Sequence, residues 1–327
     1  MSQYTYRILS KDDVGAINDL FTAAFQLQPK DNFIRWKYFS NPAGDALVAG
    51  AFYKGQLVGS GAMIPEMMSV FSQQEVVFKF TDLMTHPEHQ RKGLSKNINA
   101  LLKEEGKKIN ISFIYTLCSN VSTKSFVSNG WVFMSKVFNF FKPVSLLRIS
   151  HLLKKRSNMS FSIHHSIDHH LDDYPFQNMQ DRIHLMKSPA FLKWRTANPN
   201  FSYRLICSRD KHNKINGYLL FSTSGNKLLS IIDLEAASNN RKGIAKGLVH
   251  HAEAIAIQEG YRGVTALATE GTAFYAFMKS CNYLMNPFGK GPLKAILDFD
   301  VYNFKASDTS ITDCSNWEIL GLNYDDV

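Results

Sequence analysis

The chain has few of the features that anchor or cross-link exported proteins. Its 327 residues contain only four cysteines, which lie far apart and form no C-x-x-C pair: Cys118, Cys207, Cys281 and Cys314. No apolar run approaches the roughly 20 residues that a membrane-spanning helix needs. The first residues, MSQYTYRILSKDD, are polar and strand-like and do not resemble an export signal. We therefore expect a cytoplasmic protein with reduced thiols and no integral membrane segment.

The sequence also lacks the patterns by which proteins bind nucleic acid. It has no stripe of interleaved aromatic and basic residues and no known reading motif, so we expect no nucleic-acid partner. Its formal net charge of +9 is scattered along the chain, which suits small phosphorylated ligands. With 45% hydrophobic residues in 327 positions, the length predicts about two domains at roughly 100–200 residues each.

One six-residue segment, which we call the repeated phrase, occurs twice in similar form. Residues 91–96 read RKGLSK and residues 241–246 read RKGIAK, and each follows an apolar run that contains Asp-Leu, at Asp82 and at Asp233. A second pair of similar segments lies earlier in each half. Residues 33–37 read FIRWK and are followed by NP, and residues 191–195 read FLKWR and are also followed by NP. Two pairs of similar segments in the same order predict a duplicated domain.

Hydrophobic periodicity predicts the elements around each phrase. In the first half an apolar strand leads into the basic glycine turn, a helix begins at Gly93, and a buried strand, a short helix and a strand over 131–141 follow. A strand, a basic glycine turn and a helix N-terminus together form a phosphate-binding device. The repeat begins again near residue 180. We therefore predict domains over 1–145 and 180–327, joined by a polar connector over 146–179.

In these motifs the chain resembles the GCN5-related N-acetyltransferase (GNAT) superfamily, present in tandem. Residues 90–95, QRKGLS, resemble the family turn Q/R-x-x-G-x-G/A, with Ser95 in the last position. Thr85-His86-Pro87 resembles its V-x-P segment, and Asn120 through Gly130-Trp131 resembles its N-(x)n-G-F element. The resemblance implies an α/β (α+β) protein with a mixed sheet, built from two tandem acyl-CoA N-acyltransferase folds.

The resemblance further implies acetyl-CoA as cosubstrate and no metal, even though the connector contains a histidine-rich tract over 164–170. Free amides at the turn would bind the pyrophosphate of the cosubstrate, with charge from Arg91 and Lys92 and close approach allowed by Gly93. Backbone groups at the end of the preceding strand would pair with the pantetheine arm. The expected cofactor-binding residues are Leu83, Met84, Thr85, Gln90, Arg91, Lys92, Gly93, Leu94, Ser95, Lys96, Asn120 and Phe126.

Asp82 is the expected catalytic residue. Aminoglycoside acetyltransferases of the superfamily have a similar D-L-x-V segment, and a carboxylate there can hold the acceptor ammonium or take its proton. The tyrosine that many members use as general acid corresponds to Phe126, which cannot donate a proton. Water or a nearby side chain (Ser122, Ser125 or Cys118) would replace it, or the thiolate would leave unaided.

The second half departs further from the family pattern. Asn240 takes the Gln/Arg position of its turn, and Asn282 replaces the counterpart of Gly130. We therefore expect the first half to bind acyl-CoA, and the second half to be degenerate or to shape the acceptor pocket.

These features predict an N-acetyltransferase that moves an acetyl group from acetyl-CoA to a primary amine by direct attack in a ternary complex. The segment FIRWKYFSNP and the closing WEILG are similar to acetyltransferases encoded with bacterial surface-polysaccharide genes. An amino sugar is therefore the first choice of small-molecule acceptor. A mycothiol-synthase-like acetyltransferase and a non-catalytic CoA-binding regulatory protein are the alternatives. The oligomeric state is left open.

Overall fold

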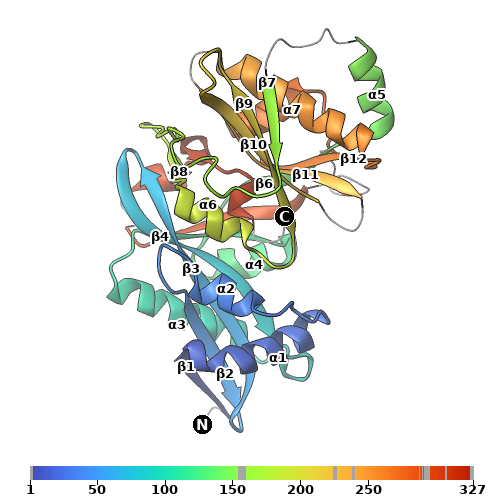
Figure 1. Cartoon of the computed structure of the whole chain (residues 1–327). Helices are drawn as coiled ribbons and strands as arrows, with labels where there is room; N and C mark the ends of the chain where they lie inside the picture. The colour runs from blue at the N-terminus through green and yellow to red at the C-terminus, as the bar shows by residue number, and fades with distance from the viewer. Residues whose placement is uncertain are drawn as a thin grey trace. The chain divides into compact units, whose positions relative to one another are not determined.

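The computed structural model describes residues 3–153, 160–223, 227–237, 240–286, 288, 290, 295–305 and 308–324. The chain forms two compact units (Figure 1). Unit 1 comprises Met1–Met134, Ala197–Asn200 and Asp298–Asp313, and unit 2 comprises Ser135–Thr196, Phe201–Leu297 and Cys314–Val327. Among the described residues, no helix is both long and apolar enough to span a bilayer.

Unit 1 is built on a mixed sheet with the strand order β1-β2-β3-β4-β5-β13. The first four strands pair antiparallel, β4 and β5 pair in parallel, and β13 runs antiparallel to β5. The strands are β1 (Tyr4–Leu9), β2 (Leu47–Tyr53), β3 (Gln56–Val70), β4 (Gln73–Thr85), β5 (Phe113–Cys118) and β13 (Ala295–Asn303).

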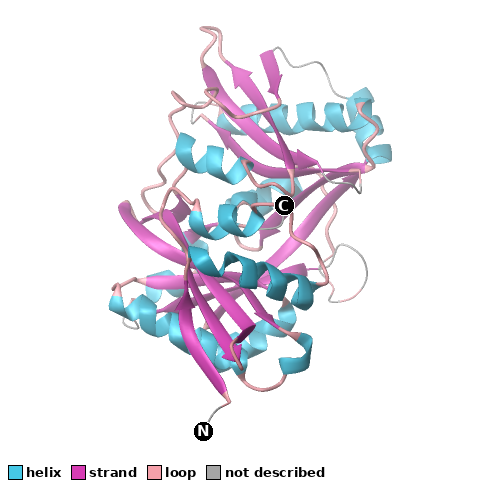
Figure 2. Ribbon diagram, turned by 60° about the horizontal axis from the view of Figure 1, so that its bottom comes forward, coloured by secondary structure: helices cyan, strands magenta, loops and turns pink. Residues whose placement is uncertain are grey.

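Helices cover both faces of this sheet, as the cyan ribbons in Figure 2 show. Ile17 and Phe33, from the two helices on one face, pack with Val48 of β2, whereas Leu94 from the opposite face packs with Ala49. Val48 and Ala49 are consecutive residues, and consecutive strand side chains point to opposite faces. The helices are α1 (Val14–Phe25) and α2 (Phe33–Phe39) on the first face, and α3 (Leu94–Lys108) and α4 (Asn120–Ser128) on the second.

Unit 2 repeats this plan with the strand order β6-β12-β11-β10-β9-β7, in which β11 and β12 are the parallel pair. Its strands are β6 (Val132–Pro143), β7 (Ser160–His164), β9 (Ser202–Arg209), β10 (Ile215–Thr223), β11 (Leu228–Ala236) and β12 (Gly263–Thr269). A short parallel pair consists of β8 (Ile183–Leu185) and β14 (Trp317–Glu318). The helices are α5 (Val144–Leu153), α6 (Pro189–Thr196), α7 (Arg241–Gln258) and α8 (Ala273–Ser280). Single 3-10 turns are Lys11–Asp13, Pro87–His89, Thr309–Thr312, Cys314–Asn316 and Gly321–Asn323.

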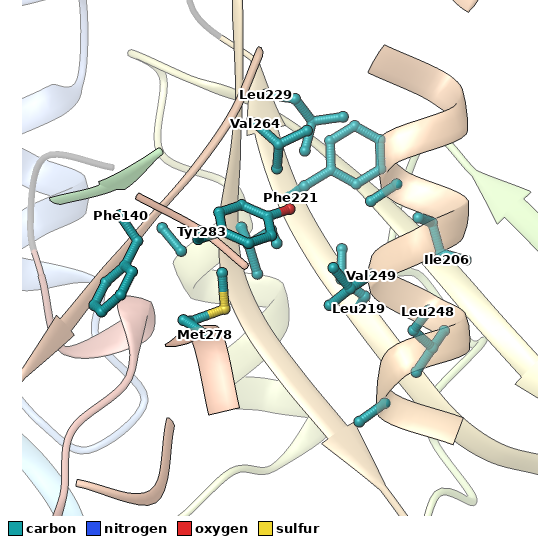
Figure 3. Packing of buried hydrophobic residues seen from close by; sticks show 14 of the residues in the cluster. Phe140, Ile206, Leu219, Phe221, Leu229, Leu248, Val249, Val264, Met278 and Tyr283 are labelled. Atoms are coloured by element: carbon teal, nitrogen blue, oxygen red, sulfur yellow. The ribbon is translucent and has the colours of Figure 1, made fainter. Parts of the chain in front are cut away.

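The core of unit 2 lies between α7 and the sheet (Figure 3). Leu248 and Val249 of α7 face Ile206 and Leu219 from the strands, and all four side chains are buried. Met278 of α8 extends the same cluster. Burying each such side chain contributes roughly 1.5–3 kcal/mol relative to leaving it exposed. This packing fixes α7 against the sheet of unit 2.

The two halves of the chain exchange their last strands. The strand that we expected over 131–141 forms as β6, but its residues Val137–Pro143 pair with β12 of unit 2. The place beside β5 is taken by residues 298–303 of β13, from the other end of the chain. The apolar pattern in the sequence predicts that a strand forms, but it does not specify the strand with which it pairs. The domain bounds 1–145 and 180–327, with a connector over 146–179, stay a prediction about where the sequence repeats begin and end.

Candidate functional site

The parallel strands of unit 1 stop pairing before they end. Their pairing runs from Phe78 with Ile114 to Phe80 with Thr116, whereas β4 continues to Thr85 and β5 to Cys118. The backbone of β4 beyond Phe80 is therefore no longer paired with β5. The carboxyl end of parallel strands is the usual position for ligands in α/β sheets.

A β-bulge lies in this unpaired part of β4. Across the neighbouring strand β3, Thr81 faces Ala62 and Met84 faces Ser60, so one residue of β3 opposes both Asp82 and Leu83. Asp82 has a φ of 51°, in the left-handed region, which residues other than glycine adopt at an energetic cost. Bulges and strained residues concentrate at functional sites, where they redirect backbone groups.

Two buried side chains of α2 hold Asp82. Its Oδ2 lies 2.6 Å from the Lys37 ammonium and accepts a hydrogen bond of 2.6 Å from the Tyr38 hydroxyl. The Lys37 side chain is only 3% exposed, and a buried ammonium is tolerated only when it is paired. The pair therefore ties α2 to the bulge. Our reading of the sequence missed this role, although the recurrence of the aromatic–basic segment FIRWK marked the segment itself.

The turn that we expected at Gln90–Lys96 has two residues in the left-handed region just before α3. After the 3-10 turn Pro87–His89, Arg91 has a φ of 61° and Gly93 a φ of 76°, and α3 begins at Leu94. The N-cap residue Gly93 provides no side-chain cap for the first amides of α3 in the described part of the chain, and Arg91 and Lys92 are exposed. Free amides, the positive end of the helix dipole and two cationic side chains favour an anion at this place.

Two expected cofactor residues lie apart from this turn. Phe126 is 3% exposed and packs edge-on against Phe80 and Trp131, with ring centroids 5.3 and 4.9 Å away. Asn120 is the exposed first residue of α4. The Leu94 side chain is buried in the core and does not face the exposed turn. The bulge and the turn supply the remaining expected residues, from Leu83 to Lys96.

A polar cluster lies at the end of β5, beneath α4. The Cys118 thiol donates to Asp300 over 3.3 Å, and the Thr123 hydroxyl donates to Asp298 over 2.8 Å. Burial raises the pKa of Asp300 to about 6 and that of the Cys118 thiol to about 12. Cys118 therefore keeps its proton at neutral pH.

Unit 2 contains a counterpart of the held aspartate. Pairing of β11 with β12 runs only from Leu228 to Ile231 on β11, which continues to Ala236. Beyond it, Asp233 lies 2.8 Å from the Lys187 ammonium and accepts 2.6 Å from the Tyr218 hydroxyl. Both units therefore hold the aspartate of their Asp-Leu pair with a lysine and a tyrosine. Asp233 is fully buried.

The second copy of the repeated phrase has a different backbone. Helix α7 begins at Arg241, so that Arg241, Lys242 and Gly243 are its first helical residues. The left-handed residue here is Asn240, with a φ of 72°, and Gly243 has no positive φ. The Asn240 side chain lies over Gly243, where it occupies the space of an added Cβ. The same three residues thus form a glycine turn in unit 1 and a helical turn in unit 2.

A pocket of about 460 Å³ lies beside the start of α7. Its walls come from the end of β11, the first turn of α7, one face of α8 and the segments 177–187 and 318–323, all within unit 2. The sequence left two alternatives for the second half, a degenerate domain or one that shapes the acceptor pocket, and the choice between them stays a prediction.

Comparison with known proteins gives a family match for the first part of the chain and a shared fold for the whole. Residues 5–123 match the model described as an acetyltransferase (GNAT) domain. No curated protein matches the chain. Among solved structures, the chain is similar to a probable N-acyltransferase from Enterococcus faecalis V583, at 11% identity and a TM-score of 0.67, covering 92% of this chain and 72% of that one. It is similar to a tandem GNAT protein from the clavulanic acid biosynthesis pathway, at 13% identity and a TM-score of 0.62, covering 92% and 98%.

A third similar structure is Saccharomyces cerevisiae N-myristoyltransferase with bound myristoyl-CoA, at 11% identity and a TM-score of 0.62, covering 93% of this chain and 79% of that one. The chain therefore has two tandem folds of the acyl-CoA N-acyltransferase kind, as the motifs implied. The family model of a GNAT domain matches residues 5–123, which lie within unit 1.

Proposed function

We propose that this protein transfers an acetyl group from acetyl-CoA to a primary amine of a small molecule, with the cosubstrate bound by unit 1. The observation that carries the proposal is the turn at Gln90–Lys96. There a left-handed glycine leads into an uncapped helix directly after a bulged strand that has left its parallel partner. A pyrophosphate needs amide donors and positive charge, and this turn offers both.

The chemistry follows from the position of the bulge. In this proposal the backbone amides near Leu83 and Met84 donate to the thioester carbonyl oxygen and stabilise the oxyanion that forms on attack. The neutral amine attacks the carbonyl carbon directly, the new C–N bond forms, and the C–S bond then breaks to release CoA as a thiolate that takes up a proton. Holding both reactants in one complex supplies much of the rate.

Asp82 is the proposed catalytic carboxylate, which holds the acceptor ammonium or takes its proton. Its bonds to Lys37 and Tyr38 give it a second task, since they also fix the strained bulge. The two tasks predict different kinetics. Loss of a general base lowers kcat by about 10²–10⁴-fold, whereas loss of the bulge geometry also weakens CoA binding.

The test compares Asp82→Asn with Lys37→Met, using thiol release from acetyl-CoA with amino sugars, polyamines and peptides as acceptors. The amide oxygen of Asn can still accept hydrogen bonds from Lys37 and Tyr38, so we expect Asp82→Asn to lower kcat at least about 10²-fold and to change the Kd for CoA less than Lys37→Met does. We expect Lys37→Met to change both quantities. An unchanged transfer rate in Asp82→Asn would show that Asp82 does not catalyse the reaction.

An amino sugar is the proposed acceptor, because of the likeness of the FIRWKYFSNP and WEILG segments to transferases encoded with bacterial surface-polysaccharide genes. A cytoplasmic location is proposed with it, supported by four cysteines that are all free thiols. Phe126 in place of a proton-donating tyrosine favours one other candidate, a CoA-binding regulatory protein. Tight CoA binding without turnover across the whole acceptor panel would support that candidate.

A further inference from the structure

Two histidines and a glutamate lie together in the loop between β4 and α3. His86, Glu88 and His89 each offer one ligand atom, and these three atoms lie within 4.8 Å of one another. Among the residues that the structure describes, no other group of three His, Cys, Asp or Glu residues is gathered in this way. Glu88 is exposed, so an ion from solvent can reach the group.

The local backbone brings the two rings together. His86 directly precedes the 3-10 turn Pro87–His89, and its carbonyl oxygen accepts the His89 amide over 2.9 Å. Side chains three positions apart eclipse each other in a 3-10 turn, and Pro87 at the first position favours the dihedrals of the turn. The imidazoles of His86 and His89 therefore lie on the same side of the turn, with ring centroids 5.8 Å apart.

A tyrosine of the edge strand β1 orients the His89 ring. The Tyr4 hydroxyl lies 3.0 Å from His89 Nδ1. Histidines that bind metals almost always donate their other ring N–H to a neighbouring group, which fixes the tautomer and the ring orientation. We assign the His89 proton to Nδ1, where it is donated to the Tyr4 oxygen, so that the lone pair lies on Nε2. Nε2 has no hydrogen-bond partner among the described residues.

The ligand types select the metal. Imidazole nitrogens suit zinc and its neighbours in the first transition row, whereas magnesium and calcium prefer oxygen ligands. Two imidazoles and one carboxylate are an established ligand set for zinc, with water as the fourth ligand.

The group needs only a small closure to hold such an ion. Zinc ligands at about 2.0–2.2 Å stand about 3.3 Å apart in a tetrahedron, so atoms within 4.8 Å of one another must approach by at most about 1.5 Å. The exposed Glu88 side chain can rotate to do this. His86 is also weakly held, since its Nδ1 accepts the Glu88 amide over 3.4 Å, which is long for a hydrogen bond.

We propose that His86, Glu88 and His89 bind one Zn²⁺ ion with water in the fourth position, and that Tyr4 is the positioning residue that orients His89. The ion links the loop before α3 to β1 through Tyr4. This site differs from the absence of a metal that the family resemblance implied. It does not depend on the proposed function, because metal binding is measured without a cosubstrate.

The test is calorimetric titration of the full chain with Zn²⁺ in a phosphine reductant. We expect His89→Gln to lose one equivalent of zinc relative to wild type. His169→Gln is the matched control, because His169 also lies 2.8 Å from a carboxylate, that of Asp172, but belongs to no group of three ligands among the described residues. We expect it to keep every equivalent. Equal zinc binding by wild type and His89→Gln, or the same loss in His169→Gln, overturns the proposal.

Glu88→Gln tests the carboxylate at an exposed position, where the fold does not depend on the side chain. We expect it to weaken zinc binding about tenfold or more, since the ion loses its charged ligand. Glu104→Gln changes another exposed glutamate of unit 1 and should leave zinc binding unchanged. Equal effects of the two variants contradict a carboxylate ligand at position 88.

Tyr4→Phe tests the positioning role, since it removes the hydroxyl and keeps the ring. We expect zinc affinity to fall by about 10–100-fold, with an unchanged thermal midpoint in the presence of a chelator. Tyr53→Phe is its control, because the Tyr53 ring also lies 5.0 Å from the His89 ring, whereas its hydroxyl has no hydrogen-bond partner in the described ranges. Wild-type zinc affinity in Tyr4→Phe, or an equal loss in Tyr53→Phe, would refute the role of the Tyr4 hydroxyl.

Cobalt(II) as a substitute for zinc identifies the ligands by absorption. Thiolate ligands give an intense near-ultraviolet band with this ion, whereas nitrogen and oxygen ligands do not, and the chain has four free cysteines. We expect no such band for the equivalent of cobalt that His89→Gln loses. A near-ultraviolet band that disappears in His89→Gln would place a cysteine at the ion and contradict the proposed ligand set.

Discussion

Replacing the glycine of each repeated phrase by alanine distinguishes the two copies, because the change in unfolding free energy is expected to differ in sign. Gly93 has a φ of 76°, and no atom lies within 4 Å of the place where its Cβ would stand. The cost of Gly93→Ala is therefore purely conformational. An L-residue held in the left-handed region costs roughly 1–2 kcal/mol, and we expect unit 1 to lose about that amount of unfolding free energy.

Gly243 stands in the first turn of α7 with ordinary helical dihedrals. Alanine in a helix is more favourable than glycine by roughly 0.5–1 kcal/mol. The added Cβ meets only the end of the Asn240 side chain, which can rotate away. We therefore expect Gly243→Ala to leave unit 2 unchanged or to stabilise it by up to about 1 kcal/mol.

Urea unfolding followed by circular dichroism measures both changes, and two units that unfold separately give two transitions. CoA titration in parallel should show weaker binding for Gly93→Ala than for Gly243→Ala. Equal losses of stability would refute the difference in backbone between the copies. Equal losses of CoA affinity would refute the assignment of the cosubstrate to unit 1.

Three further substitutions test individual contacts. Lys187→Met leaves the buried Asp233 carboxylate without its ammonium and should cost about 3–5 kcal/mol of unfolding free energy, measured by urea titration; a loss below 1 kcal/mol would contradict the pairing. Burial raises the pKa of Asp300 to about 6 from 3.8, so its ionisation destabilises the fold as pH rises from about 4 to 6, by an upper limit of ~3 kcal/mol. Asp300→Asn should therefore be more stable than wild type at pH 7 and lose that advantage near pH 4; the opposite order would be incompatible with the shift. Gly321→Ala should cost about 1–3 kcal/mol through overpacking against the Ile232 backbone, and an unchanged thermal midpoint would argue against that contact.

The duplication and the fold were predictable because local sequence patterns carry them. The two RKG phrases, each after an Asp-Leu strand, predicted two folds of one kind, and the similar structures confirm this. The sequence marked Gly93 as a residue that allows close approach of a ligand to the backbone, and the structure adds a second reason for glycine, a φ of 76°. Short-range sequence signals of this kind determine turns and helix starts because only neighbouring residues take part in them.

The long-range contacts that hold Asp82 and form the pocket of unit 2 were not predictable in the same way. Lys37 and Asp82 are 45 positions apart in the sequence, and their pairing depends on how α2 lies on β4. The pocket of unit 2 depends on segments near residues 180 and 320 that meet only in the folded chain. Neither spacing nor composition specifies such long-range contacts.

By itself, the sequence determined that this protein repeats a strand, a basic turn and a helix, because those elements form from neighbouring residues. Only the tertiary structure decided that identical Arg-Lys-Gly residues form a turn in one unit and a helix in the other. It also decided that the halves exchange their last strands, residues 298–303 joining β5 and β6 joining β12. Both outcomes depend on which surfaces pack together, since a strand and a three-residue phrase are each compatible with more than one partner.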